Sequence, residues 1–569
     1  MPFRSRLAAL LMLPLSSPLH ADTVFDPAMA PRIDAIFAEY AKPGSPGCAF
    51  ALYERGRVLY EKGYGLASIE HDLAIDPRQT VFDIGSTSKQ FTATSILLLA
   101  QDGKLALDDS VRKYIPELPG YFDKVTLDHL LNHTGGVRDY IGLLMLGGIN
   151  FQDHATDADA LRVIARQKAL DFVPGSEHSY SNSGYFLLSL VVKKASGKSL
   201  REFAHERIFA PLGMHQTRFL DDHAQIIPHR ATSYAPRPDG TWVLSTSAWE
   251  QTGDGQVQTT VRDLARWDAN FHEPKVGGAA LIAQLQQVGI LNNGKPITYA
   301  RGLIIDDYRG LRAVSHGGSW IGFRAELLRF PSTGIAAAAL CNVGASQPWT
   351  LLRAVADVVL EDRLQAAPKA AAVAANADAT SKAMAKAPVF EPDHYIGTYF
   401  GPDQSLVRRI ENRDGKLWYV RDGGRDNELA YEGDNRFRML DVPVPAVLQV
   451  VRDKDGQRRM TLDIGDQRTE MHAVAPFAPD AEALAAFAGE YESVELDARW
   501  RLAVDGTQLK LHPRRGDALP LSPAFTDAFT GSGLLRFQRN GNGDITGFEL
   551  NAGRSRGISF RRRAETSVD

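Results

Sequence analysis

Residues 81–103 read VFDIGSTSKQFTATSILLLAQDG. The stretch begins extended and apolar, turns at Gly85, and continues as a segment that is apolar on nearly every side, which is typical of a buried helix. Gly103 stands where a glycine commonly ends a helix. Ser86 falls in the first turn and Lys89 three residues later, so their side chains share one face. A half-buried lysine there loses solvation, which disfavours its ammonium form and lets it accept the serine proton.

A second Ser-x-x-Lys spacing runs from Ser110 to Lys113, directly after Asp108 and Asp109. We interpret this copy as a capped surface turn. The spacing alone is weak evidence, and the surrounding sequence has to decide between the two copies.

The composition is that of an ordinary soluble globular protein. The chain has 569 residues, of which 44% are hydrophobic and 23% are charged. This length predicts two to four domains. The formal net charge of −4 gives no reason to expect nucleic acid or an anionic membrane as a partner.

The N-terminus is typical of a secretory signal peptide, predicted here as residues 1–21. Arg4 and Arg6 precede a short apolar core from Leu7 to Leu15, and Ala21 offers a small residue for cleavage. The alternative is a membrane anchor, but the core is short for a span. We therefore expect a periplasmic or secreted protein without stable membrane insertion. The absence of a nearby cysteine argues against a lipoprotein.

The sequence contains two cysteines, Cys48 and Cys341. An oxidising compartment permits a disulfide but does not require one. Single cysteines within apolar, strand-like runs are more often buried thiols.

The order of predicted elements indicates an α+β unit over residues 22–365. An early hairpin (48–64) and three late strands (314–341) are free to join one sheet, and a helix over 349–364 closes the unit. Residues 366–388 are rich in alanine and predict an exposed linker.

Two segments of similar pattern follow, 389–476 and 480–569. Each begins with a Gly-x-Tyr pattern and later has an Asp-Gly turn between alternating strands, so we predict a degenerate tandem repeat of small antiparallel β-barrels. Neither contains a serine–lysine–tyrosine cluster. We expect them to regulate access to the serine site and to take no part in its chemistry.

Three motifs stand in order along the α+β unit: Ser86-Thr87-Ser88-Lys89, Tyr180-Ser181-Asn182 and His316-Gly317-Gly318. Together they resemble those of the serine β-lactamase and penicillin-binding protein superfamily, and Tyr-x-Asn is similar to its class C-like branch. The three-part architecture resembles that of D-aminopeptidases with two C-terminal barrels. The resemblance implies an antiparallel sheet flanked by helices, with a helical subdomain.

The same resemblance implies a role for each motif residue. Ser86 would attack an acyl carbonyl, and Lys89 and Tyr180 would share the work of general base and acid, with a tyrosine phenolate beside an ammonium as one proton carrier. Asn182 would orient Lys89 and hold the substrate amide. The remaining implied site residues are the substrate-binding His316, Gly317 and Gly318, and the oxyanion-hole amides of Ser86 and Ser319. No metal or organic cofactor is implied.

The third motif departs from the family pattern. Penicillin-recognising relatives usually have Lys-Thr-Gly where this chain has His316-Gly317-Gly318. Neither the lysine charge nor the hydroxyl that would meet a β-lactam carboxylate is present. Both changes weaken a β-lactamase interpretation and favour a peptidase or an esterase.

His133, in the Leu-Asn-His-Thr-Gly-Gly loop, is a second candidate base. No partner with triad or metal spacing lies near it in the sequence. We interpret it as a loop histidine satisfied by backbone groups.

The leading hypothesis is an exported serine hydrolase that cleaves a peptide or amide bond next to a D-amino acid, of the D-aminopeptidase or D-Ala carboxypeptidase type. The alternatives are a carboxylesterase of the same fold and a non-catalytic binder of peptidoglycan or protein. The expected partner is a small peptide, amide or ester substrate, and the oligomeric state stays open. In the fold that the chain resembles, the first strand lies antiparallel beside the last, which implies that Cys48 and Cys341 are neighbours and leaves open whether they bond.

Overall fold

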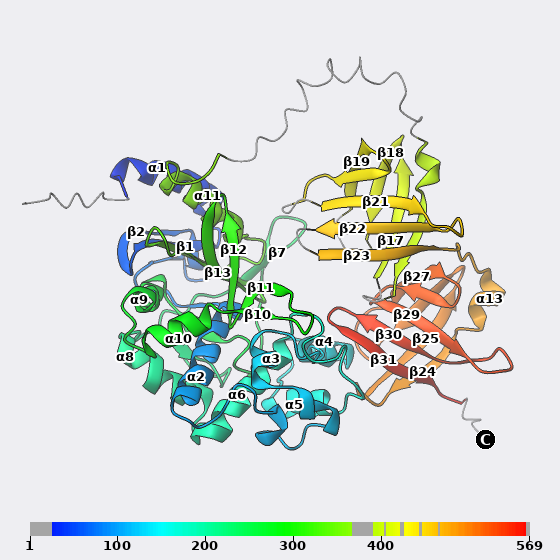
Figure 1. Cartoon of the computed structure of the whole chain (residues 1–569), viewed down its shortest axis with the longest axis horizontal. Coiled ribbons are helices and arrows are strands. Elements are labelled where there is room, and N and C mark those ends of the chain that lie inside the picture. The colour runs from blue at the N-terminus through cyan, green and yellow to red at the C-terminus, as the bar shows by residue number, and fades with distance from the viewer. Residues whose placement is uncertain are drawn as a thin grey trace, which may run out of the picture.

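The computed structural model describes residues 25–366, 391–402, 406–421, 426–442, 446–464 and 467–564. The predicted signal peptide and all but the first residue of the predicted linker lie outside these residues. An N-terminal α+β unit lies beside two β-barrels, which are drawn in yellow and in orange to red (Figure 1). No helix of the described residues is long and apolar enough to cross a membrane.

The α+β unit is built on an eight-stranded sheet in the order β10-β11-β12-β13-β14-β15-β1-β2, and every pair of neighbours is antiparallel. The first hairpin therefore joins the late strands in one sheet, as the sequence predicts. The strands are β1 (Cys48–Glu54), β2 (Arg57–Tyr64), β10 (Val288–Ile290), β11 (Pro296–Ala300), β12 (Leu303–Tyr308), β13 (Leu311–Trp320), β14 (Phe323–Phe330) and β15 (Ile335–Cys341).

Both faces of the sheet are covered, because the apolar residues of β1 alternate between two cores. Phe50 and Leu52 pack into the core under α1 (Ala30–Ile36) and α11 (Pro348–Val359). Ala49, Ala51 and Tyr53 pack into the larger core on the other face. A strand with side chains of period two and both faces buried reads as a continuous apolar run.

The larger core contains the buried helix predicted after Gly85. The chain passes from β5 (Phe82–Asp83) through the 3₁₀ turn η3 (Gly85–Ser88) into α2 (Lys89–Gln101), and Gly103 follows with a φ of +66°. The other helices of the unit are α3 (Leu127–Leu131), α4 (Tyr140–Leu146), α5 (Asp157–Ala165), α6 (Asn182–Ser196), α7 (Leu200–Ala204), α8 (Ala210–Leu212), α9 (Val261–His272) and α10 (Gly278–Leu285).

Short strands and turns connect these helices. They are η1 (Pro27–Met29), η2 (Ala38–Ala41), η4 (Val111–Lys113), η5 (Gly120–Lys124), η6 (His205–Phe209), β3 (Leu66–Ser68), β4 (Leu73–Ala74), β6 (Arg218–Phe219), β7 (Tyr234–Pro236), β8 (Trp242–Leu244) and β9 (Val257–Thr259).

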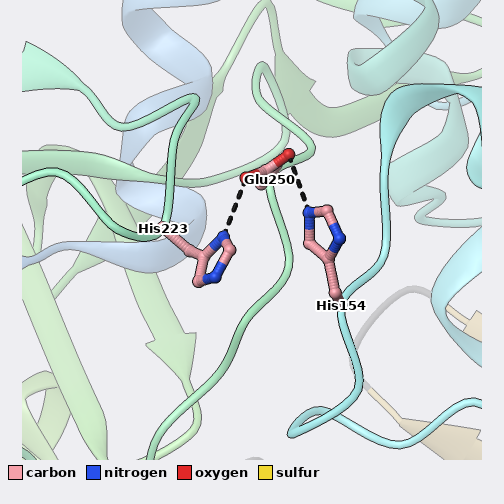
Figure 2. A group of neighbouring side chains, drawn as sticks. All are labelled: His154, His223 and Glu250. Carbon is pink, nitrogen blue, oxygen red and sulfur yellow. Dashed lines mark hydrogen bonds and ion pairs between the residues drawn. The ribbon is translucent and has the colours of Figure 1, made fainter.

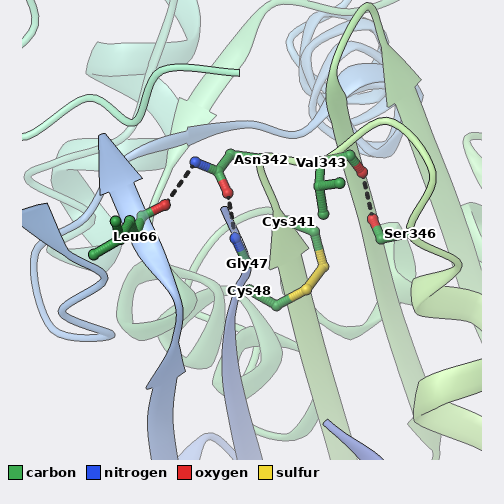
Figure 3. The surroundings of a disulfide bond; sticks show 7 residues. All are labelled: Gly47, Cys48, Leu66, Cys341, Asn342, Val343 and Ser346. Carbon is green, nitrogen blue, oxygen red and sulfur yellow. Dashed lines mark hydrogen bonds between the residues drawn. A yellow bond between two sulfur atoms is a disulfide. The ribbon is translucent and has the colours of Figure 1, made fainter. Parts of the chain in front are cut away.

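Cys48 and Cys341 form a disulfide between β1 and β15 (Figure 3). The two residues are direct partners in the antiparallel register, and their Cα atoms lie 4.0 Å apart. The expected neighbourhood is confirmed. The interpretation of two buried thiols is wrong, because strand pairing brings the side chains together across adjacent strands.

The two C-terminal segments are closed barrels of eight antiparallel strands each, which confirms the predicted tandem repeat of barrels. The first contains β16 (Gly397–Gly401), β17 (Leu406–Arg413), β18 (Lys416–Val420), β19 (Asn427–Gly433), β20 (Arg436–Met439), β21 (Ala446–Arg452), β22 (Arg458–Ile464) and β23 (Gln467–Val474), after the turn η7 (Pro392–His394). The second contains β24 (Gly489–Ser493), β25 (Ala498–Asp505), β26 (Gln508–His512), β27 (Leu519–Phe525), β28 (Ala528–Thr530), β29 (Leu534–Arg539), β30 (Ile545–Ala552) and β31 (Ser555–Arg562), after α13 (Ala481–Ala485). The predicted domain boundaries enclose these strands and stay predictions.

The second barrel is packed tightly against the α+β unit. Its interior residues, such as Trp500 and Phe560, belong to the same continuous apolar core as α2 and α6. At the contact, buried Arg138 donates hydrogen bonds to Glu495 of the second barrel (2.7 Å) and to Asp171 (3.1 Å). The first barrel has a separate core. Of the two barrels, only the second shares an apolar core with the α+β unit among the described residues.

Two features of the structure differ from the sequence prediction. The last helix ends at Val359 and not at Leu364, where a turn follows. Strands β10 to β12 have no strict alternation, and sequence reasoning missed them.

Candidate active site

Ser86 lies at the junction between the sheet and the buried helix. Asp83 accepts a hydrogen bond from the Gly85 amide (2.7 Å), which fixes the turn that presents the serine. Thr87 donates to the carbonyl of His316 on β13 (3.0 Å), and Ser88 accepts from the Val257 amide (3.0 Å). The residues around Ser86 are thus tied to two different strands, while the Ser86 side chain stays partly exposed.

Lys89 is buried and sits among three oxygen acceptors. Its ammonium lies 3.0 Å from the hydroxyl of Ser86, 3.0 Å from the side-chain oxygen of Asn182 and 2.6 Å from the backbone carbonyl of Asp254. Three acceptors match the three hydrogens of an ammonium group. The structure therefore brings the predicted nucleophile, the predicted base and the predicted orienting residue together.

Burial lowers the pKa of Lys89 to about 7. The negative charges of Asp254 and Asp139 act in the opposite direction, and the positive charge of Arg554 adds to the lowering. A lysine whose pKa is close to neutral is partly unprotonated at physiological pH and can accept a proton from the serine.

Asn182 is held by Asp139, a residue that sequence reasoning did not single out. One carboxylate oxygen of Asp139 accepts hydrogen bonds from both the backbone and the side-chain amide of Asn182, each 2.9 Å long. Its other oxygen caps α4 through the Ile141 amide (3.2 Å). Because the side-chain nitrogen of Asn182 is held in this way, its oxygen is turned toward Lys89.

The Tyr180 ring lies 4.9 Å from the Lys89 ammonium, measured to the ring centroid. The phenol oxygen is buried and forms no hydrogen bond of good geometry among the described residues. Burial raises the pKa of Tyr180, and the nearby Ser86 side chain lowers it by less. The raised pKa favours the neutral phenol, a proton donor, over the phenolate that the family resemblance suggested.

The third motif lies on β13, directly beside the Ser86 turn. A side chain at Gly318 would place its Cβ 1.8 Å from the Ile84 carbonyl oxygen, so only glycine allows this approach. A Cβ at Gly85 would lie 2.6 Å from the Ser319 amide nitrogen. The Ser319 amide thus lies next to the turn that carries Ser86, and the assignment of these two amides to an oxyanion hole stays a prediction.

His316 is neutral in this setting. Burial, together with the positive charge of Lys89, lowers the pKa of His316 to about 3. One ring nitrogen lies 3.0 Å from the Tyr299 hydroxyl, and the other lies 2.6 Å from the Gly317 carbonyl. Gly317 faces the buried Glu326 carboxyl, which a Cβ would approach to 2.7 Å. The motif therefore brings no positive charge to the site.

His133 bonds the backbone of the second motif and packs against Tyr180. Its Nδ1 accepts a hydrogen bond from the Ser181 amide (3.2 Å), and its ring lies 4.1 Å from that of Tyr180, centroid to centroid. Burial lowers the pKa of His133 well below its usual value. The backbone bond to Nδ1 agrees with the interpretation of a loop histidine, but the buried Nε2 has no hydrogen-bond partner among the described residues, so the histidine is only partly satisfied. Its ring helps to place Tyr180.

The second Ser-x-x-Lys copy is the capped turn that the sequence indicated. Ser110 caps η4 through the Arg112 amide (3.3 Å), and Lys113 forms an ion pair with Asp109 (2.8 Å). The serine and the lysine of this copy are thus each bonded elsewhere.

Arg554 reaches the site from the turn between β30 and β31 of the second barrel. Its guanidinium carbon lies 4.8 Å from the centroid of the Tyr180 ring, and one of its nitrogens lies 3.6 Å from Asp139. Nothing in the local sequence, Asn-Ala-Gly-Arg-Ser, singles this arginine out. The second barrel therefore brings one of its turns to Tyr180. The expectation that the barrels regulate access and take no part in the chemistry stays a prediction.

Asp254 is a third residue that sequence reasoning missed, after Asp139 and Arg554. Only the glycines on either side of it, Gly253 and Gly255, signal a close approach of the backbone. A Cβ at Gly253 would lie 2.4 Å from the Tyr185 carbonyl oxygen. This close packing brings the Asp254 carbonyl to Lys89, and Tyr140 donates a hydrogen bond to the Asp254 side chain (3.1 Å).

A cluster of His154, His223 and Glu250 lies outside this site (Figure 2). His223 lies 2.8 Å from one carboxylate oxygen of Glu250, and His154 lies 3.1 Å from the other. These are hydrogen-bond distances, so the Glu250 carboxylate links the two imidazoles. The Glu250 amide also donates to the Ala155 carbonyl (3.1 Å), so the cluster connects the segments that carry His154, His223 and Glu250. The prediction of a metal-free site stays a prediction.

Comparison with known proteins gives consistent matches. The Beta-lactamase family model matches residues 25–360. A D-aminopeptidase of Gluconobacter oxydans is 26% identical over 93% of this chain and 98% of its own length. A penicillin-binding protein of Bacillus subtilis is 32% identical over 49% of this chain, and the match spans 64% of that protein.

Solved structures show the same fold. The octameric penicillin-binding protein homologue from Pyrococcus abyssi has a TM-score of 0.55 at 22% identity, over 78% of this chain and 99% of its own. The D-amino acid amidase from Ochrobactrum anthropi SV3 has a TM-score of 0.51 at 21% identity, over 59% of this chain and 99% of its own.

Proposed function

Because the chain belongs to the Beta-lactamase family and is a serine hydrolase, we propose that it cleaves a peptide or amide bond next to a D-amino acid. The observation that carries the proposal is Lys89, which lies 3.0 Å from the Ser86 hydroxyl and has its pKa lowered to about 7. The full-length similarity to D-aminopeptidases supports the D-specific substrate class.

The first half of the reaction forms an acyl-enzyme. The Ser86 oxygen attacks the carbonyl carbon as its proton passes to the unprotonated amine of Lys89. The charge that develops on the carbonyl oxygen is stabilised by the backbone amides of Ser86 and Ser319. When the bond to nitrogen breaks, the leaving amine takes a proton from the neutral phenol of Tyr180. The Lys89 ammonium then gives its proton to the Tyr180 phenolate, so both groups return to their starting protonation states.

Water completes the cycle. It attacks the acyl carbonyl, a proton passes back through the same two groups, and the Ser86 hydroxyl is regenerated as the acid product leaves. Asn182, held by Asp139, keeps the Lys89 amine directed at Ser86 throughout.

A carboxylesterase of the same fold would use the same groups, since the chemistry of an ester differs only in its better leaving group. Tyr180 favours the amide, because an amine needs a proton to leave and an alkoxide needs it less. A non-catalytic binder has no need for a lysine of lowered pKa beside a serine.

The test combines active-site labelling with a substrate panel. A fluorophosphonate probe should label the wild type and the Ser110→Ala variant, and should not label Ser86→Ala. Turnover in Ser86→Ala should fall on the order of 10⁶-fold. D- and L-aminoacyl p-nitroanilides and p-nitrophenyl esters then separate the classes: faster turnover of the D-anilides supports the proposal, and turnover of esters alone supports the esterase. Loss of labelling in Ser110→Ala with labelling retained in Ser86→Ala would instead identify Ser110 as the nucleophile.

We also propose that the protein is exported to the periplasm or secreted after cleavage behind Ala21. The basic and apolar N-terminus supports this, and so does the disulfide, which persists in oxidising compartments. N-terminal sequencing of the protein from its native host should begin at Asp22, and a chain that retains Met1 or the apolar core would contradict the proposal.

A further inference from the structure

A large cavity opens where the α+β unit and the two barrels meet. Its volume is about 1200 Å³, and residues of all three parts line it. The α+β unit contributes Ser176–Ser179, directly before Tyr180, and part of β11. The first barrel contributes the start of β17, and the second barrel contributes the β30–β31 turn with Arg554. Ligand pockets for small molecules have volumes of roughly 300–1,000 Å³, so this cavity has room for several peptide residues.

The wall of the cavity is positively charged. Five basic side chains line it, Lys295, Arg408, Arg468, Arg554 and Arg556, against three acidic ones, Asp171, Glu177 and Asp306.

Each of the acidic side chains is already neutralised by an arginine. Asp171 pairs with Arg138 (3.1 Å), Glu177 with Arg556 (3.1 Å) and Asp306 with Arg353 (3.0 Å). Arg556 is thus paired with Glu177, and Arg468 lies 3.8 Å from both Asp463 and Glu470. The lining cations that no acidic side chain of the cavity wall neutralises include Arg408 and Arg554.

Arg408 lines the cavity from the first barrel. Among the described residues, it donates hydrogen bonds to neutral oxygens, the Tyr419 hydroxyl (3.0 Å) and the Val407 carbonyl (2.7 Å). The positive wall thus extends from the serine site to the first barrel.

Arg554 stands at the catalytic end of the cavity. Its side chain is 49% exposed, and its nearest carboxylate, Asp139, lies 3.6 Å away and already accepts two hydrogen bonds from Asn182. The guanidinium keeps donors for another carboxylate, which it can bind in a bidentate manner. It lies over the ring of Tyr180, the group that protonates the leaving amine in the mechanism above. The cation is therefore on the leaving-group side of the bond that is cut.

We propose that this cavity binds an acidic peptide as the leaving group, with Arg554 holding a carboxylate within one or two residues of the bond that is cut. The proposal rests on the proposed hydrolase activity at Ser86 and narrows its substrate class. Since His316 is neutral and bonded to Tyr299, Arg554 supplies the positive charge that the third motif does not.

The experiment compares matched substrates that differ only in charge. D-Alanyl-glutamate is paired with D-alanyl-glutaminamide, and hydrolysis is followed by release of D-alanine. In the wild type, kcat/KM should be about 10–100-fold higher for the acidic member, the range of a charge-assisted hydrogen bond. In Arg554→Gln this ratio should fall close to one, and Arg554→Lys should restore part of it. Arg501→Gln, an exposed arginine on β25 of the same barrel, is the control and should keep the wild-type ratio.

A binding measurement keeps the proposal testable apart from turnover. Calorimetry with Ser86→Ala should give a tighter Kd for the acidic peptide than for the amide, and the difference should shrink as salt is raised. Equal affinities, or an unchanged ratio in Arg554→Gln, would overturn the acidic-peptide proposal while leaving hydrolysis at Ser86 intact. If the probe does not label Ser86, or if the protein hydrolyses no amide, the proposed function is wrong. The comparison of Kd values would still test whether the cavity prefers an acidic peptide.

Discussion

At the scale of single residues, the site depends on Lys89, whose burial favours the unprotonated amine. Lys89 makes three contacts to oxygen, yet burial outweighs them and lowers its pKa to about 7. Two carboxylates, Asp254 and Asp139, limit this lowering, and Arg554 increases it. Burial and these three charged groups together set the pKa of Lys89 close to neutral pH.

The pH dependence of kcat/KM should report this balance. The unprotonated amine is the active form, so kcat/KM should rise with pH and level off above about 7. Arg554→Gln removes a nearby positive charge, which should raise the pKa of Lys89 and move the rise to higher pH. Arg501→Gln should leave the curve in place. A rise centred well below pH 7 in the wild type would contradict Lys89 as the base.

Sequence reasoning found Ser86, Lys89, Tyr180 and Asn182 because short motifs carry their spacing. It missed Asp139, Asp254 and Arg554 because these residues reach the site through tertiary packing. The Asp254 carbonyl and the Arg554 turn come from segments 165 and 465 residues after Lys89 in the chain. No local pattern records such a distant contact.

At the scale of elements, β13 and the 3₁₀ turn that carries Ser86 are pressed together. Gly318 permits the contact, since an added Cβ would lie 1.8 Å from the Ile84 carbonyl oxygen. The Ser319 amide, next along β13, depends on this approach for its position.

Gly318→Ala should therefore impair catalysis, because the strand or the Ser86 turn must move to make room for the added Cβ. A shift of about 1 Å in a positioned group lowers kcat by up to about 100-fold. Steady-state kinetics should show this loss mainly in kcat. Gly120→Ala, where nothing lies within 4 Å of the added Cβ, is the matched control. Wild-type kcat in Gly318→Ala would show that the strand can move without consequence for the site.

The three late strands could be predicted because sharp turns separate apolar runs there, although β13 begins at Leu311, before the predicted start at residue 314. The turn after Phe330, Pro-Ser-Thr-Gly, is an example. Strands β10 to β12 could not be predicted in the same way. Their residues are partly exposed at the edge of the sheet, so the period-two pattern is incomplete.

At the scale of the whole molecule, the second barrel and the α+β unit behave as one packed body. A buried ionic network joins them, with Glu495 only 1% exposed and 2.7 Å from Arg138. The Ser559 amide also donates to Glu495 (3.1 Å), which ties the network to β31. Strand β31 follows the turn that carries Arg554, so the network also fixes the turn at the serine site.

Glu495→Gln should destabilise the protein, because it removes a negative charge beside buried Arg138 and turns an NH2 group toward a donor, either Arg138 or the Ser559 amide. Breaking a buried pair in this way costs about 3–5 kcal/mol. Urea unfolding should show the loss, and it should be accompanied by a weaker preference for acidic leaving groups. Glu490→Gln, an exposed residue of β24 in the same barrel, is the control and should change little. Unchanged stability in Glu495→Gln would mean that apolar packing alone holds the barrel in place.

The disulfide between the first and last long strands of the sheet has a topological consequence. It turns residues 48–341 into a closed ring, with the N-terminal segment and both barrels attached as tails. When a protease cuts one loop of this ring, the disulfide still joins the two resulting fragments. Limited digestion should therefore give a nicked species that keeps its full mass without reductant and falls into two fragments with it. Separation of the fragments before reduction would show that the ring was never closed.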